Sequence, residues 1–300
     1  MKDKLNVIDF QHIYYKYKNM VDMGRMKALT DENGNNISVK YYVLKEIERI
    51  SEHGMVDTVI CFESRHNRHK EDNEDYKAKR VKTLGESDFS CISEIADILD
   101  KCGYKVLKVD GYEADDLVAS VVTYYDSGEG TGQYKEIDVY TIDNDMLQLI
   151  EGTINIMMYR MGKGYVRINT ENFDEVSSML KAEVPFNTVM IYKATVGDKS
   201  DNIMGVKGFG VAAYERMIEW LKSVKGKFEL MNKEEVVQSV LSVYFEKILS
   251  DTAKKEQALD SLKLVTMDRH IKDINYNIES VDIANKNLVY NSLGMNSLVK

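Results

Sequence analysis

The chain has 300 residues, of which 44% are hydrophobic and 30% are charged, and its formal net charge at pH 7 is -9. This length allows one large core or two modest ones, and the charged fraction excludes a membrane protein. The chain starts directly in an apolar strand-like run without a signal-peptide pattern, so we expect a cytoplasmic protein. The cysteines Cys61, Cys91 and Cys102 lack metal-ligand spacing, which favours reduced packing residues over disulfides or zinc ligands.

In the first part of the chain, apolar β-prone runs alternate with helix-like segments. The strand-like runs are 5–8, 56–62, 104–109 and 137–142, and the helix-like segments between them include 39–50 and 92–99. This alternation predicts an α/β fold with a parallel sheet.

The pattern changes near Pro185, the single proline. Helical periodicity without a convincing strand follows it at 186–196, 212–222 and 234–249. We therefore expect an α/β domain over residues 1–184 and a helical domain over residues 185–300.

Each expected strand is followed by acidic residues. They are Asp9 after the first strand, Glu63 after the second, Glu113, Asp115 and Asp116 after the third, and Asp143 and Asp145 after the fourth. Because the carboxyl ends of parallel strands lie on one edge of the sheet, these side chains should meet in one crevice. Their mutual repulsion requires cations, and oxygen ligands indicate Mg²⁺ or Mn²⁺.

Each acidic group also has an ordinary explanation. The acids at 113–116 could only decorate a helix N-terminus, where negative charge is favourable. Asp143 and Asp145 could form a turn and an N-cap. The conjunction favours the metal site, since capping does not require every strand to end in acid. Bound divalent ions would also return positive charge to an otherwise acidic protein, whose composition alone argues against nucleic-acid binding.

Two further segments suit a polymeric substrate. The glycines Gly205, Gly208 and Gly210 precede an expected helix from about Val211 and would expose backbone N–H groups to a phosphate, although a plain helix–helix turn explains them too. Between Glu63 and Asp88 lies a basic insertion that would draw in a nucleic-acid strand, or would form a solvated charged helix pair. Its basic and aromatic residues are Arg65, His66, Arg68, His69, Lys70, Tyr76, Lys77, Lys79, Arg80 and Lys82.

Three motifs together resemble the flap endonuclease and 5′-3′ exonuclease family, which includes free-standing bacteriophage enzymes and the nuclease domain of bacterial DNA polymerase I. They are GYEADD at 111–116, DNDMLQL at 143–149 and GDKSDNI at 197–203. The resemblance runs in order from Asp9 to about Trp220, and roughly the last eighty residues carry no motif that we can assign. It implies a PIN-like α/β domain with a helical arch at about 64–90, and a helical domain with a helix-three-turn-helix at about 190–223.

The same resemblance implies the site residues. One metal would be surrounded by Asp9, Glu63, Glu113, Asp115 and Asp116, and Asp143, Asp145, Asp198 and Asp201 would complete the shared site, with Asp143 also catalytic. In the arch, Tyr76 would stack on a base while the catalytic residues Lys77 and Arg80 contact the scissile phosphate. Lys193, Gly205, Lys207, Gly208 and Gly210 would bind the DNA backbone. The implied ions are Mg²⁺, for which Mn²⁺ would substitute, and K⁺ at the helix-three-turn-helix.

Three positions depart from the family pattern. Glu63 stands where the family usually has Asp, Phe10 replaces a Gly and Met204 replaces a Pro. Only Glu63 belongs to the expected metal site. Because its side chain is one methylene longer than that of Asp, its carboxylate would displace the metal or contact it through a water.

These residues predict two-metal hydrolysis of DNA with 5′ ends or 5′ flaps by a monomer that does not bind membranes. One alternative is a nuclease that removes RNA primers from an RNA–DNA hybrid. A second is a non-catalytic, structure-specific DNA-binding protein, and a third is a metal-dependent phosphatase with Asp9 as nucleophile. The basic insertion and the glycine turn suit a polymer better than a small phosphate ester.

Overall fold

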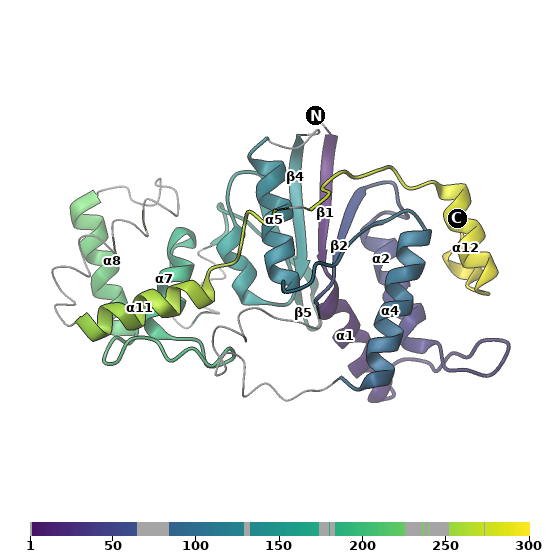
Figure 1. Ribbon diagram of the computed structural model, residues 1–300, viewed down its shortest axis with the longest axis horizontal. Helices are drawn as coiled ribbons and strands as arrows, with labels where there is room; N and C mark the ends of the chain where they lie inside the picture. The colour runs from purple at the N-terminus through teal and green to yellow at the C-terminus, as the bar shows by residue number, and fades with distance from the viewer. Residues whose placement is uncertain are drawn as a thin grey trace.

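The computed structural model describes residues 2–64, 84–128, 133–173, 180, 184–225, 236, 240, 252–272 and 274–300. Figure 1 shows a central sheet with helices on both faces and a helical part beside it. No helix among these residues is both long and apolar enough to cross a membrane.

Six strands form one sheet in the order β3-β2-β1-β4-β5-β6. The strands are β1 (Lys2–Asp9), β2 (Asp57–Cys61), β3 (Lys105–Leu107), β4 (Tyr134–Thr141), β5 (Ile154–Arg160) and β6 (Gly164–Ile168). The first five are parallel, and β6 pairs antiparallel with β5. The order reverses between β1 and β4, so their carboxyl ends flank the kind of crevice where open α/β sheets bind ligands.

The four strands expected from the sequence are confirmed, whereas β5 and β6 were not expected. The segment 154–168 has a strand, a glycine-containing turn with Gly162 and Gly164 at positive φ, and a second strand. This is an ordinary hairpin signal. The sheet is therefore mixed at one edge rather than wholly parallel.

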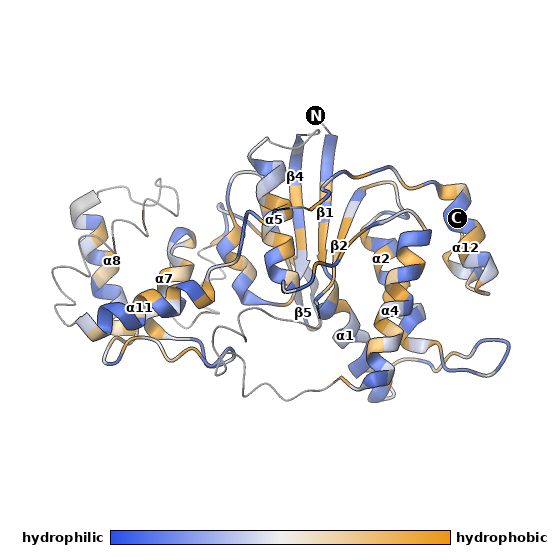
Figure 2. Ribbon diagram, viewed as in Figure 1, coloured by the Kyte–Doolittle hydropathy of each residue, from blue (hydrophilic) through white to orange (hydrophobic). Residues whose placement is uncertain are grey.

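Successive side chains along each strand point to opposite faces of the sheet, so the sheet has one hydrophobic core on each face. Leu5 and Val7 of β1 pack with α5 (Ala114–Asp126) on one face of the sheet. Ile8 packs on the other face with α1 (Phe10–Asp22), α2 (Ser38–Ile50) and α4 (Glu86–Lys101). Figure 2 shows apolar strands between helices whose outer surfaces are hydrophilic. Burial on both faces is typical of parallel sheets.

From Pro185 to Val265 the described chain consists of helices joined by loops. It contains η3 (Phe186–Thr188), α7 (Val189–Val196), α8 (Val211–Lys225) and α11 (Thr252–Val265). Helix α7 contacts both α8 and α11. The helices expected at 186–196 and 212–222 are confirmed, and the one expected at 234–249 falls almost entirely outside the described residues.

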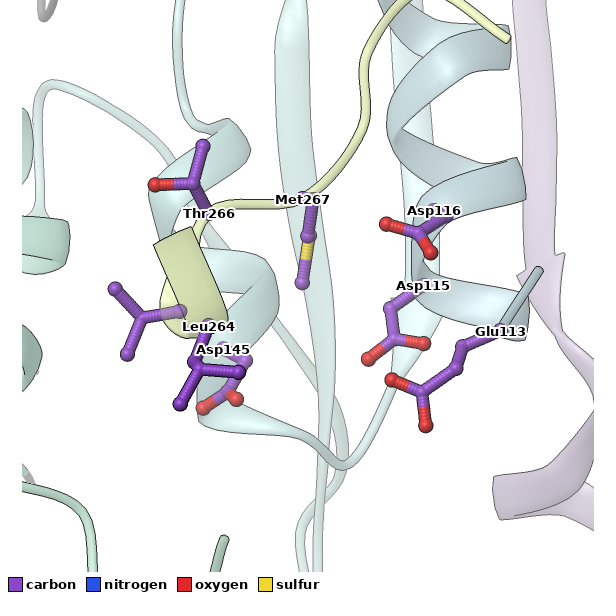
Figure 3. Close-up of a pocket in the computed structure, with 8 residues that line it drawn as sticks. Glu113, Asp115, Asp116, Asp145, Leu264, Thr266 and Met267 are labelled. Atoms are coloured by element: carbon purple, nitrogen blue, oxygen red, sulfur yellow. The ribbon is translucent and has the colours of Figure 1, made fainter. Parts of the chain in front are cut away.

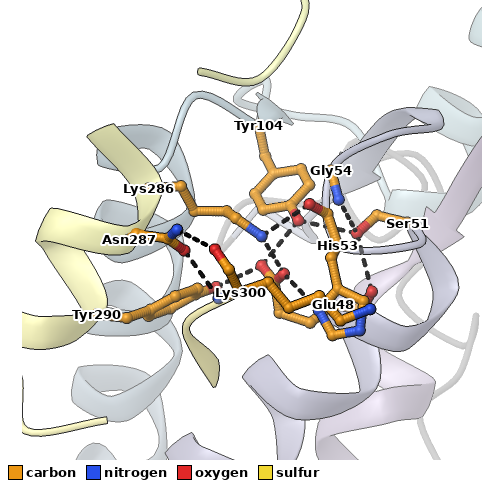
Figure 4. A network of polar contacts seen from close by, with 9 residues as sticks. All are labelled: Glu48, Ser51, His53, Gly54, Tyr104, Lys286, Asn287, Tyr290 and Lys300. Atoms are coloured by element: carbon orange, nitrogen blue, oxygen red, sulfur yellow. Dashed lines mark hydrogen bonds and ion pairs between the residues drawn. The ribbon is translucent and has the colours of Figure 1, made fainter. Parts of the chain in front are cut away.

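The end of the chain returns to the sheet. From α11 it crosses beside α5 and reaches α12 (Ile283–Ser292) and η6 (Asn296–Leu298), as Figure 1 shows. In Figure 4, buried Lys286 of α12 pairs with Glu48 of α2, which also accepts hydrogen bonds from Tyr104 Oη at 2.8 Å and Tyr290 Oη at 2.7 Å. Residues 283–298 thus contact the α/β part, and a domain boundary at Pro185 stays a proposal.

Candidate metal centre at the carboxyl edge of the sheet

Asp9 ends β1 and lies in the interior, at the reversal of strand order. Its Oδ2 accepts a hydrogen bond from Thr141 Oγ at the end of β4, at 2.9 Å. Burial raises the pKa of Asp9, the Thr141 hydrogen bond opposes it, and the negative charges of Asp143 and Glu63 add to the rise, which reaches about 7. Acids from the ends of two neighbouring strands therefore act electrostatically on Asp9.

The backbone around Asp9 is held by His12, for which the sequence carries no motif. His12 is buried, and that burial lowers its pKa to about 3, so its imidazole is neutral. Nδ1 lies against the Asp9 carbonyl oxygen, which only accepts, so Nδ1 carries the proton. Nε2 then accepts from Tyr165 Oη on β6, at 2.8 Å. The unexpected β5–β6 hairpin thereby supports the end of β1.

The second acidic group follows β4. Asp143 is the N-cap of η1 (Asn144–Leu149), and its Oδ1 accepts from the backbone N of Asp145 at 2.8 Å. The backbone N of Asp143 donates to Thr141 Oγ at 3.0 Å. The expected N-cap is thus present, and the same turn brings Asp143 close enough to influence Asp9.

The third group begins α5. Glu113 is its N-cap residue, and Asp115 and Asp116 lie in its first turn. These three residues line a pocket together with Asp145 and the segment 264–267 from the end of α11. In Figure 3 the acids of α5 lie on one side of this pocket, and Asp145 lies with Leu264 and Thr266 on the other.

Lys193 on α7 is buried and forms ion pairs with Asp145 and with Asp198, the latter at 2.8 Å. Burial alone would raise the pKa of Asp198, but Lys193 and Ser200 lower it to about 2. The acids of η1 and of the loop after α7 therefore share one ammonium group. The expected contact between Lys193 and a DNA phosphate stays a prediction.

The loop from Gly197 to Gly210 has a packing reason for its glycines. A Cβ on Gly205, whose φ is +64°, would lie 2.6 Å from the backbone N of Gly197, so two backbone segments cross there. At Gly208 and Gly210 an added Cβ would meet nothing within 4 Å, which leaves those positions open to a ligand. The backbone N of Lys207 donates to Gln257 Oε1 of α11 at 3.3 Å. The helix–helix turn is therefore observed, and phosphate binding stays a prediction.

The remaining expected site residues are placed as follows. Asp201 is buried in the loop after α7 and does not line the pocket of Figure 3. Tyr76, Lys77 and Arg80, with the rest of the expected arch from 65 to 83, lie outside the described residues. Within the described part of the chain, no three Asp, Glu, His or Cys side chains are grouped closely enough to form a metal site by themselves.

The donor chemistry nevertheless fits a hard divalent cation. Every expected ligand is a carboxylate, and Mg²⁺ and Mn²⁺ prefer oxygen ligands while keeping several waters. Burial, and then the negative charges of Asp143 and Glu63, raise the pKa of Asp9, and a bound cation would favour the ionised carboxylate against both. The fold and this edge define an α/β protein with Asp9 and Asp143 at the topological switch point and an acidic pocket between the start of α5, η1 and the end of α11.

Comparison with known proteins then gives the family. The model of the 5′-3′ exonuclease N-terminal resolvase-like domain matches residues 4–178. The chain belongs to this 5′-3′ exonuclease family.

Curated relatives match over different extents. A 5′-3′ exonuclease of Mycoplasma genitalium is 40% identical over 138 residues, which are 46% of this chain and 44% of the relative. A 5′-3′ exonuclease of Mycoplasma pneumoniae is 31% identical over 191 residues, 63% of this chain and 60% of the relative. DNA polymerase I of Caldicellulosiruptor bescii is 29% identical over 94% of this chain and 31% of its own length. The chain thus spans less than two thirds of the length of each of these relatives.

Solved structures share the fold. The D15 protein of T5, co-crystallized with metal ions, aligns with a TM-score of 0.60 at 15% identity, covering 99% of this chain and 100% of that one. Flap endonuclease-1 of Methanococcus jannaschii aligns with a TM-score of 0.55 at 13% identity, covering 99% and 91%. The expected PIN-like α/β architecture followed by a helical part is confirmed.

Proposed function

We propose that this protein is a divalent-metal-dependent 5′ nuclease that hydrolyses DNA phosphodiesters at 5′ ends and 5′ flaps, with a role in DNA replication or repair. The observation that carries the proposal is the placement of acids at the carboxyl edge of the sheet. Thr141 joins Asp9 and Asp143 by hydrogen bonds, and Glu113, Asp115, Asp116 and Asp145 line one pocket. Relatives described as 5′-3′ exonucleases support it, as do metal ions and DNA in crystals of the T5 enzyme.

In this proposal Asp9, Glu63, Glu113, Asp115 and Asp116 hold one Mg²⁺, and Asp143, Asp145, Asp198 and Asp201 complete the site. When bound, the ions would lower the pKa of the attacking water and stabilise the negative charge on the leaving 3′ oxygen. Thr141 orients the Asp9 carboxylate through its hydrogen bond, and the N-cap geometry of Asp143 fixes that carboxylate relative to η1.

The remaining residues would bind the substrate. Lys77 and Arg80 add charge stabilisation at the scissile phosphate, and Tyr76 stacks on a neighbouring base. The loop from Gly205 to Gly210 contacts the backbone without reading sequence. A contact between Lys193 and a phosphate requires its ammonium group to leave Asp145 and Asp198. A monomer that acts in the cytoplasm, and K⁺ at the helix-three-turn-helix, remain predictions from the sequence.

The test uses a 5′-flap DNA labelled at both ends, incubated with the full chain in Mg²⁺, Mn²⁺ or chelator, with products resolved by size. Cleavage near the junction only with metal supports the proposal, and a ladder from the 5′ end indicates stepwise degradation. An RNA-primed duplex run in parallel tests for primer removal. Tight flap binding with no product in either metal would contradict the proposal and favour a non-catalytic DNA-binding protein.

A further inference from the structure

The segment after α11 forms one wall of the acidic pocket. Leu264, Val265, Thr266 and Met267 line the same pocket as the acids of α5 and Asp145. Figure 3 shows this segment passing between η1 and the start of α5. It therefore lies between two of the acidic groups that the proposed function requires to act together.

On the η1 side the segment is fixed by Gln148, three residues after Asp145. The Gln148 side chain is buried, its Nε2 donates to the Val265 carbonyl at 3.0 Å, and its Oε1 accepts from the backbone N of Met267 at 3.3 Å. Arg269 donates to the backbone carbonyl of Gln148 at 2.8 Å. One amide thus satisfies both a donor and an acceptor of the backbone where α11 ends, which fixes this segment against η1.

On the α5 side the segment is fixed by Asp116 and Ser120, which are one helical turn apart and both buried. The backbone N of Asp268 donates to Asp116 Oδ1 at 2.8 Å. Ser120 Oγ donates to the Asp268 carbonyl at 3.0 Å and accepts from the backbone N of Ile271 at 3.1 Å. The hydrogen bond at Asp116 orients one of the proposed metal ligands directly.

We infer that residues 265–271 clamp the acids of α5 to those of η1, and that Gln148 and Ser120 are positioning residues for the metal site. The inference rests on the proposed function. Mg²⁺ requires near-ideal geometry, and outer hydrogen bonds that orient its ligands typically change metal affinity by ~10- to 100-fold when removed. The clamp adds hydrogen bonds from buried side chains of α5 and η1 to the direct apolar packing between these two elements.

A matched control lies further along the same segment, away from the pocket. Tyr125 Oη donates to the carbonyl of Tyr276 at 2.6 Å, and Tyr276 stacks on Tyr124 with ring centroids 4.2 Å apart. Tyr125→Phe removes one side-chain hydrogen bond to the returning chain and leaves the hydrogen bonds of Gln148, Asp116 and Ser120 in place. Gln148→Met and Ser120→Ala remove hydrogen bonds of the clamp itself.

The test measures Mn²⁺ binding to the full chain by titration calorimetry, with the melting temperature of each variant recorded without metal. We expect Gln148→Met and Ser120→Ala to bind Mn²⁺ about 10-fold more weakly than the wild type, and Tyr125→Phe to bind as the wild type does although it melts at a lower temperature. If Gln148→Met does not fold, Ser120→Ala carries the test, because it removes a single oxygen.

Unchanged Mn²⁺ affinity in folded clamp variants would overturn the inference alone. Equal weakening in all three variants would also overturn it, because the effect would then follow global stability. A wild-type chain that binds no Mn²⁺ would overturn the proposed function first, so the two failures are distinguishable.

Discussion

The Nζ atom of Lys193 lies 2.8 Å from a carboxylate oxygen of Asp198, five residues later in the chain, and also pairs with Asp145. Lys193 is only 4% exposed, and both acid side chains are largely buried. A buried ammonium between two carboxylates ties η1, α7 and the following loop together. Removing one member of such a group leaves buried charge without compensation.

Lys193→Met should therefore destabilise the protein by roughly 3 kcal/mol, because Asp145 and Asp198 would repel each other without the ammonium. Urea denaturation at pH 7 measures the free energy of unfolding. Lys222→Met is the control, since its pair with Glu219 at 3.4 Å is exposed and should contribute at most about 0.5 kcal/mol. If both substitutions lowered the free energy of unfolding equally, the buried ion pairs of Lys193 would stabilise the protein no more than an exposed pair does.

The crossing of two backbone segments at Gly205 predicts a graded effect of alanine. Gly205→Ala should be the most destabilising, because its Cβ would lie 2.6 Å from backbone atoms of Val196 and Gly197 at a φ of +64°. Gly208→Ala should lower the free energy of unfolding by only about 1 kcal/mol, the strain of the left-handed backbone, because the space around Gly208 is open. Thermal melting of both variants and of Gly210→Ala gives the order, and a Gly210→Ala variant as unstable as Gly205→Ala would contradict the packing argument.

Stability should fall in acid partly through Glu46 on α2. Burial alone would raise the pKa of Glu46, but hydrogen bonds from Arg49 and Lys16 outweigh it and lower the pKa to about 2 from an ordinary value of 4.5. A depressed folded pKa contributes stability that is present above 4.5 and is lost as the pH falls towards 2. The free energy of unfolding of wild type and Glu46→Gln should differ at pH 6 and converge near pH 2. A difference that stays constant with pH would contradict this origin.

The parts predictable from sequence were those with a local signal. The expected strand at 5–8 with Asp9 behind it, and the expected helices at 39–50 and 92–99, follow from periodicities of two and 3.6 within a few residues. The β5–β6 hairpin, which was not among the expected strands, also carries a local signal at Gly162 and Gly164.

Other features had no local signal. Gln148 contacts a segment 117 residues later, and Glu48 contacts one 238 residues later. A polar residue in a helix-like stretch gives no indication of a partner at that distance along the chain. For the same reason, the sequence shows that Lys193 precedes the GDKSDNI motif at 197–203 and does not indicate that it pairs with two acids.

The central claim is that the acidic edge is a metal-dependent nuclease site, and Asp143 tests it most directly. Asp143→Ala removes the carboxylate, and Asp143→Asn keeps an oxygen that can accept from the backbone N of Asp145 while removing the charge. The measurement is single-turnover cleavage of the 5′-flap DNA in Mg²⁺, with flap binding measured in parallel. We predict that both variants lose cleavage and keep largely unchanged DNA binding, whereas wild-type cleavage by Asp143→Asn would contradict the assignment of this edge as the metal site.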